Sequence, residues 1–83
     1  MFLIEWKDGA IKQLKNLNQD ISSRIAKKVA ELSENPFSKD IKKLKGEPAF
    51  RLRVGDYRII FDVDMKNKMI YILRLGHRKN IYD

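Results

Sequence analysis

The chain has no cysteine and a single histidine, His77. Cysteine-free chains form no disulfide, thiolate nucleophile or thiolate zinc site, which suits a reducing cytoplasm, and one histidine excludes paired-histidine metal motifs. We therefore expect no metal and no cofactor. The longest apolar run, residues 69–73, is far shorter than the roughly 18 residues of a membrane span. Glu5, Lys7 and Asp8 interrupt the first ten residues, so we expect no secretion signal.

Length and charge set the next limits. A chain of 83 residues predicts one domain, residues 1–83, too small for a deep internal site. Eighteen Lys and Arg against 11 Asp and Glu give a formal charge of +7, which predicts a polyanionic or strongly acidic partner. Residues 39–83 hold twelve basic and six acidic side chains, including five of the six arginines: Arg51, Arg53, Arg58, Arg74 and Arg78.

The first half of the chain predicts one strand and two helices. Residues 2–6 are apolar and β-prone, and Asp8 then caps a first helix. Asp20 caps a second helix, which Asn35–Pro36 ends. We expect the two helices to form an antiparallel hairpin with a solvated basic face, made of Lys12, Lys15, Arg24, Lys27 and Lys28.

From residue 49 the apolar period changes to two, which indicates strands. A two-residue turn at Gly55–Asp56 predicts a hairpin in which Arg53 lies directly opposite Arg58, with Arg51 beside them on the outward face. The same register pairs apolar residues on the other face: Val54 with Tyr57, Leu52 with Ile59 and Phe50 with Phe61.

Residues 69–75 are apolar on both faces, as in a central strand. A bulged five-residue connection would place Arg58 opposite Arg74, whereas a two-residue Lys66–Asn67 turn would not. The predicted architecture is α+β, in the order β-α-α-β-β-β, with the helical hairpin on one face of a small, mainly antiparallel sheet.

The clustered arginines indicate a binding surface. Like charges directly opposite each other on adjacent strands destabilise a sheet by a few tenths to about 1 kcal/mol, so the arrangement calls for a function. Outward arginines also keep a sheet face soluble, which is the simpler interpretation of any one of them. Together they would hold phosphates through charge-assisted hydrogen bonds, and so bind nucleic acid or an acidic peptide.

A ribonuclease needs no metal where the 2′-hydroxyl of the RNA attacks the neighbouring phosphate. It needs a base, an acid and cations around the developing charge, and arginine fits only the last role. Proton transfer must then come from His77, Tyr82, a carboxylate such as Glu47, or a lysine of lowered pKa. In a continuing strand His77 and Arg78 point to opposite faces, and a structural or orienting role is the simpler interpretation of His77.

Three segments resemble the RelE/ParE superfamily of toxin–antitoxin toxins, on the RelE side. They are Lys43-Leu44-Lys45-Gly46, the run Phe50-Arg51-Leu52-Arg53-Val54-Gly55-Asp56-Tyr57-Arg58-Ile59-Ile60-Phe61, and Gly76-His77-Arg78-Lys79-Asn80-Ile81-Tyr82. The resemblance covers nearly the whole chain. It implies a cytoplasmic toxin that enters the ribosomal A site, cleaves mRNA there without metal and inhibits translation.

The resemblance also implies roles for residues. Arg58 and Arg78 would stabilise the scissile phosphate, Arg51 and Arg53 would orient the RNA at positions where lysines often stand, and Tyr82 would assist proton transfer. The RNA backbone would be contacted by Lys42, Lys43, Lys45 and Arg74. The implied partners are the ribosome, mRNA and a RelB-like antitoxin whose flexible segment folds on binding. The alternatives are a gyrase inhibitor resembling ParE and an inactive homologue that only binds its antitoxin.

Overall fold

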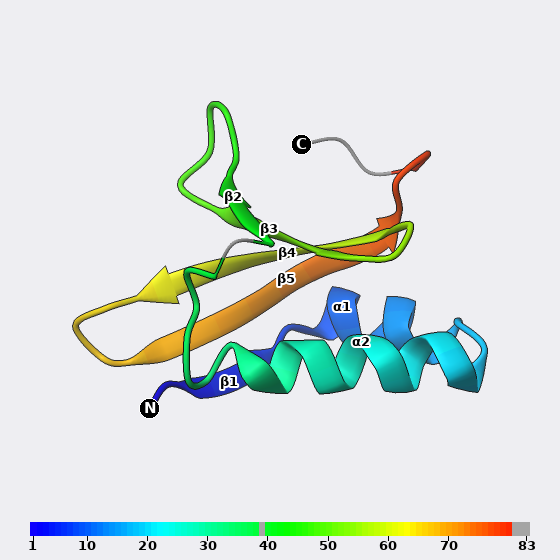
Figure 1. Ribbon diagram of the computed structural model, residues 1–83, viewed down its shortest axis with the longest axis horizontal. Helices are drawn as coiled ribbons and strands as arrows, with labels where there is room; N and C mark the ends of the chain where they lie inside the picture. The colour runs from blue at the N-terminus through cyan, green and yellow to red at the C-terminus, as the bar shows by residue number, and fades with distance from the viewer. Residues whose placement is uncertain (39, 81–83) are drawn as a thin grey trace.

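The computed structural model describes residues 1–38 and 40–80 and shows one five-stranded sheet with two helices on one face (Figure 1). The sheet order is β1-β5-β4-β3-β2, with β1 parallel to β5 and the other neighbours antiparallel. The elements are β1 (Leu3–Trp6), α1 (Asp8–Lys15), α2 (Gln19–Glu31), β2 (Ile41–Lys43), β3 (Phe50–Val54), β4 (Tyr57–Asp64) and β5 (Met69–His77). The predicted fold class is confirmed, and β2 is an additional strand. Neither helix is long and apolar enough to cross a membrane, over the residues described.

The helix ends differ from the predicted ones. Lys7 is the N-cap of α1 and makes no side-chain cap bond, while the Asn18 side chain caps α2 by accepting from the Ile21 N–H at 3.1 Å. Asp8 and Asp20 lie instead in the first turns, where a carboxylate is favoured by the helix dipole. Helix α2 ends at Glu31, before Asn35–Pro36. Just beyond that point the backbone hydrogen bonds join residues three apart, as in a 3₁₀ turn.

The β3–β4 hairpin has the predicted register: Arg53 lies opposite Arg58. Near the next turn, Asp64 pairs with Met69, which is the register that a Lys66–Asn67 turn would give. A bulge between Ile60 and Phe61 then shifts the pairing, so Arg58 lies opposite Gly76 and not opposite Arg74. The extra residue on the β5 side is therefore Leu73.

Most of the core lies between the sheet and the helices. Its fully buried members include Ile25 and Val29 from α2 and Ile59, Phe61 and Ile72 from the sheet. A smaller cluster forms on the opposite side of the sheet, which we call the outer face. There Leu44 and Ala49 pack on Ile60, with Leu73 against them. The chain around residues 44–49 therefore covers one part of the outer face and leaves the rest for charged side chains.

Candidate nucleic-acid interface

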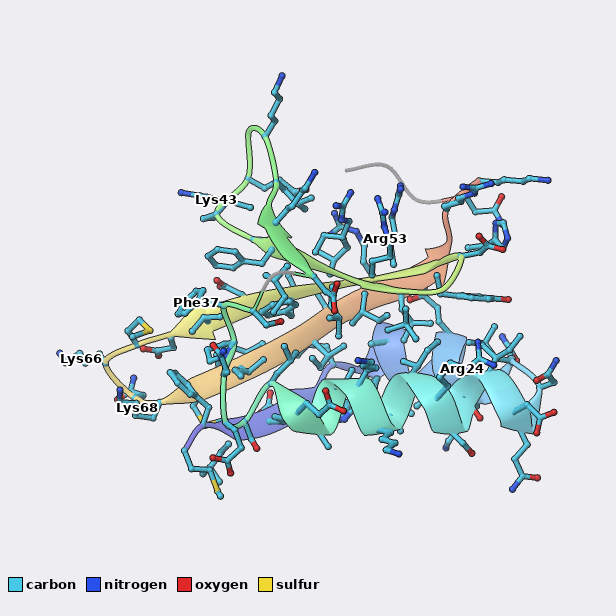
Figure 2. The ribbon with its side chains drawn as sticks, viewed as in Figure 1. Arg24, Phe37, Lys43, Arg53, Lys66 and Lys68 are labelled. Atoms are coloured by element: carbon cyan, nitrogen blue, oxygen red, sulfur yellow. The ribbon has the colours of Figure 1, made fainter. Side chains whose placement is uncertain are left out.

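Three arginines share the outer face at the centre of the site. Arg53 on β3 lies opposite Arg58 on β4, and Arg51 pairs with Ile60, so side-chain alternation places all three on the side away from the helices. Figure 2 shows Arg53 on this side and Arg24 on the helix side. The structure thus brings together the three arginines that the hairpin register predicted to be neighbours. We call them the arginine cluster.

Arg51 is the most enclosed member of the cluster, only 6% exposed. Burial, followed by the charges of Arg58 and Arg53, lowers the pKa of the Arg51 guanidinium. The Nε atoms of Arg51 and Arg58 are also buried. Holding cations together in a partly desolvated place costs folding free energy, and an arriving phosphate would offset that cost through charge-assisted hydrogen bonds.

The two lysines of β2 near the cluster lie on opposite faces of the sheet. Lys42 pairs with Arg51 and so shares its face, whereas Lys43 pairs with Phe50, whose ring packs in the core on the helix side. A cavity of about 90 Å³ lies among Lys42, Arg51, Arg53 and Asp40. Lys42 is thus placed beside the cluster and Lys43 is not.

Arg74 carries an ion pair. Its Nη2 lies 3.0 Å from Oε2 of Glu47, a residue of the segment that covers the outer face. Arg74 pairs with Ile60 in the sheet, so it lies on the same face as the cluster. Glu47 therefore partly neutralises the Arg74 guanidinium at this edge of the outer face.

His77 and Arg78 mark the end of β5. The His77 ring packs edge-on against Tyr57, with centroids 5.4 Å apart, and its Nδ1 accepts from the Lys79 N–H at 3.2 Å. Arg78 follows the strand: its N–H donates to the Asp56 carbonyl at 2.8 Å, and its Nε lies 3.9 Å from Asp56 Oδ1. Arg78 is thereby tied to the Gly55–Asp56 turn that joins the two strands of the cluster.

The remaining predicted site residue, Tyr82, lies outside the described residues. Lys45 lines a larger cavity, together with Glu47 and Arg74. Across residues 1–38 and 40–80, no three histidine, aspartate or glutamate side chains gather closely enough to hold a metal ion.

Sequence reasoning missed two contacts at this site. The Glu47–Arg74 pair joins residues 27 positions apart, and the Gln13 Oε1 accepts from the Leu75 N–H across 62 positions. No local periodicity predicts either contact. The alternation of apolar and basic residues could place Arg74 in a strand but could not identify its partner.

Comparison with known proteins agrees with this geometry. Residues 4–82 match the family described as the ParE toxin of type II toxin–antitoxin systems, parDE. The mRNA interferase toxin RelE of Escherichia coli (strain K12) is 24% identical over 81 residues, covering 94% of this chain and 84% of that protein.

Two solved complexes show the same fold. One chain of the RelB–RelE antitoxin–toxin complex of Methanococcus jannaschii is 34% identical, with a TM-score of 0.74 and 94% of each chain covered. In the archaeal RelE–RelB complex of Pyrococcus horikoshii OT3, the match is 29% identical with a TM-score of 0.83, over 96% of this chain and 98% of that one. The chain therefore belongs to the RelE/ParE family of toxins of type II toxin–antitoxin systems, as its motifs predict.

Proposed function

We propose that the protein is a ribosome-dependent mRNA endoribonuclease that acts in the cytoplasm and inhibits translation. The observation that carries the proposal is the convergence of Arg51, Arg53 and Arg58 on the outer face of the sheet. Three cations on such a surface suit the phosphates of RNA, and the E. coli relative that carries the name mRNA interferase supports cleavage as the outcome.

The reaction would use the nucleophile of the RNA itself. The 2′-oxygen attacks the adjacent phosphorus, the bond from phosphorus to the 5′-oxygen breaks, and a cyclic phosphate and a free 5′-hydroxyl result. Arg58 and Arg78 stabilise the negative charge that accumulates on the pentavalent phosphorus, and Arg51 and Arg53 orient the strand. Tyr82 assists proton transfer, because arginine remains protonated throughout.

The lysines and Arg74 take secondary parts in this proposal. Lys42, beside the cluster, and Lys45, in the covering segment, contact the backbone of mRNA or ribosomal RNA. Lys43, on the other face of β2, contacts a different part of the ribosome from Lys42. Arg74 contacts the RNA while it remains ion-paired with Glu47, so its positive charge is partly neutralised there. The orienting role of His77 acts through its packing on Tyr57.

We propose a RelB-like antitoxin as the protein partner. The Methanococcus and Pyrococcus relatives were each solved in a complex with RelB. An antitoxin segment that folds on binding would neutralise the toxin by masking or displacing the arginine cluster.

The test is charge reversal at Arg58. Arg58→Glu should abolish growth inhibition and the breaks in ribosome-bound message that primer extension detects, while the variant keeps the wild-type far-UV circular dichroism spectrum. Lys27→Glu, a reversal on the exposed side of α2, is the matched control and should remain toxic. Full toxicity of Arg58→Glu would remove Arg58 from the mechanism.

A second candidate follows from the family description, which names ParE. A gyrase inhibitor would produce double-strand breaks in DNA and leave the message intact. An inactive homologue that only binds its antitoxin would cause no growth arrest at all. The same expression experiment, scored for message and for chromosomal DNA, separates the three functions.

A further inference from the structure

Within residues 1–38 and 40–80, one edge of β5 has no strand partner near the site. Strand β1 pairs with β5 only as far as Trp6 opposite Ile72, whereas β5 continues to His77. Among the described residues, the edge of β5 from 73 to 77 is therefore not paired to a strand on the β1 side. Helix α1 lies beside this edge (Figure 1).

A side chain takes the place of a strand there. The Leu75 N–H donates to Gln13 Oε1 at 2.7 Å. Because a backbone N–H only donates, the carbonyl of the Gln13 amide must face it, and the NH₂ group of Gln13 keeps its two donors for another acceptor. A peptide strand adding to this edge would have to displace Gln13 first.

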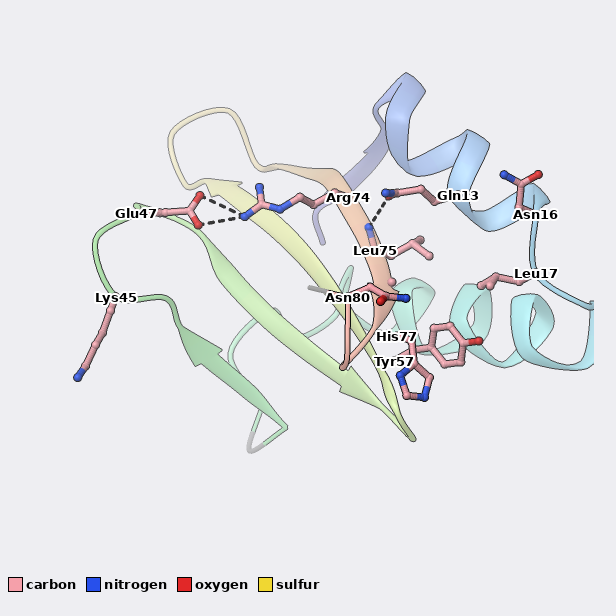
Figure 3. A pocket seen from close by; sticks show the side chains of 11 residues that line it. Gln13, Asn16, Leu17, Lys45, Glu47, Tyr57, Arg74, Leu75, His77 and Asn80 are labelled. Atoms are coloured by element: carbon pink, nitrogen blue, oxygen red, sulfur yellow. Dashed lines mark hydrogen bonds and ion pairs between the residues drawn. The ribbon is translucent and has the colours of Figure 1, made fainter. Parts of the chain in front are cut away.

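A cavity of about 740 Å³ runs along the same edge (Figure 3). Its volume falls within the roughly 300–1,000 Å³ that is typical of small-ligand sites. The Glu47–Arg74 ion pair lies at one end, the Tyr57 and His77 rings lie at the other, and Asn80 lies between them. The cavity thus combines an aromatic wall with hydrogen-bonding groups of both kinds.

Gly76 connects the cavity to the arginine cluster. It lines the cavity and pairs directly with Arg58 in the sheet. Because glycine has no side chain, no side chain of β5 separates Arg58 from the cavity at this position. Arg58 and the cavity are therefore neighbours across Gly76, so a nucleotide whose phosphate is held by Arg58 lies next to the cavity.

We propose that this cavity binds a nucleobase of the substrate RNA, unstacked from the strand next to the phosphate that Arg58 holds. The inference rests on the proposed ribonuclease function and adds a base-binding site to it. Tyr57 and His77 provide the aromatic surface on which the base stacks. Asn80 and Gln13 hydrogen-bond its edge, and the Glu47–Arg74 pair offers an acceptor beside a donor.

The carboxylate of Glu47 favours a base as the occupant of this end. A carboxylate repels phosphate, so it weakens a surface that binds only the RNA backbone. The N–H groups of a base can instead donate hydrogen bonds to the Glu47 carboxylate. Polar side chains along the edge, and Gln13 on the Leu75 N–H, favour RNA over an apolar helix or an added strand.

The test uses a short RNA with a 2′-deoxy nucleotide at the cleavage position, which binds without being cut. Each base in turn is replaced by an abasic site, and affinity is measured for the intact full chain. One abasic position should weaken binding to the wild type about ten-fold, since one stacked base contributes about that factor. In His77→Leu the same abasic change should cost clearly less than in the wild type, because one of the two stacking rings is already lost.

Glu47→Gln provides a second variant that leaves the aromatic wall intact. It should change which base is preferred at the sensitive position while retaining affinity for the abasic RNA. Lys27→Ala on α2 is the control and should keep the wild-type response at every position. In NMR spectra, the side-chain amide signals of Gln13 and Asn80 should shift with the intact RNA and not with the abasic one.

Three results would overturn the inference, and they have different consequences for the proposed function. Equal affinity for all abasic RNAs, with binding still weakened by Arg58→Gln, would remove the base pocket and leave the ribonuclease proposal standing. Absence of RNA binding at low salt would contradict both. Amide shifts at Gln13 and Asn80 with an antitoxin peptide alone would identify the cavity as a protein-docking site and also overturn the inference.

Discussion

Arg53 and Arg58 are directly opposed cations on neighbouring strands, a pairing that weakens a sheet. Arg53→Glu would convert the repulsion into attraction, so we expect the free energy of unfolding to rise by about 0.5–1 kcal/mol, measured by urea denaturation. RNA cleavage should fall in the same variant. Arg53→Gln, which only removes the repulsion, should give a smaller gain. A less stable Arg53→Glu variant would contradict this account of the cluster.

Arg51 shows how far single residues can be predicted from the sequence. Alternation with Phe50 and Leu52 places its side chain on the outward face, as the structure confirms. Alternation also predicts solvent exposure there, yet Arg51 is buried. The chain around residues 44–49 packs onto Ile60 and encloses part of this face. Which distant segment packs over a sheet face depends on tertiary contacts. The alternation of residues along a strand gives no information about such contacts.

At the scale of elements, long periodic runs were predictable and short or irregular features were not. The β3–β4 hairpin follows from its Gly55–Asp56 turn and its alternation. Strand β2 has three residues, two of them lysines, so its composition resembles a loop. Such lysines are typical of edge strands, where they oppose aggregation. Without the bulge between Ile60 and Phe61, the register from Asp64–Met69 would place Leu75 opposite Arg58; the bulge places Gly76 there, and no residue pattern marked it.

The β4–β5 turn makes a prediction about pH. The Asp64 carboxylate accepts from the Asn67 N–H at 3.0 Å and from the Asn67 side-chain amide at 2.9 Å. These bonds lower the pKa of Asp64 in the folded state. A lowered carboxyl pKa stabilises the fold above the unfolded-state value of about 3.9 and loses that contribution as pH falls through the folded-state pKa.

Asp64→Asn should therefore lower the melting temperature slightly at pH 6, and the difference from wild type should shrink as the pH falls from about 4 toward 2. Thermal denaturation followed by circular dichroism across this range is the measurement. Asn67→Ala removes the donor side chain and should reduce the same pH-dependent difference. A difference between Asp64→Asn and wild type that is constant with pH would exclude the carboxylate charge as its cause.

On the scale of the whole molecule, the charge is divided between the two halves of the chain. Residues 1–38 carry six basic and five acidic side chains, whereas residues 39–83 carry twelve and six. Strands β2 to β5 all come from the second half, and the arginine cluster lies on β3 and β4. The excess positive charge thus belongs to the part of the chain that builds the proposed RNA surface, so RNA binding should depend strongly on salt.

The salt dependence can be assigned to individual side chains. For single-stranded RNA, the logarithm of the association constant falls with the logarithm of salt concentration by about 0.7 for each phosphate neutralised. Arg58→Gln should therefore reduce the magnitude of the slope by about 0.7 with an uncleavable RNA. Lys27→Gln removes the same charge from the exposed side of α2 and should leave the slope unchanged. Equal changes in the two variants would mean that net charge alone governs binding, without a specific role for the arginine cluster.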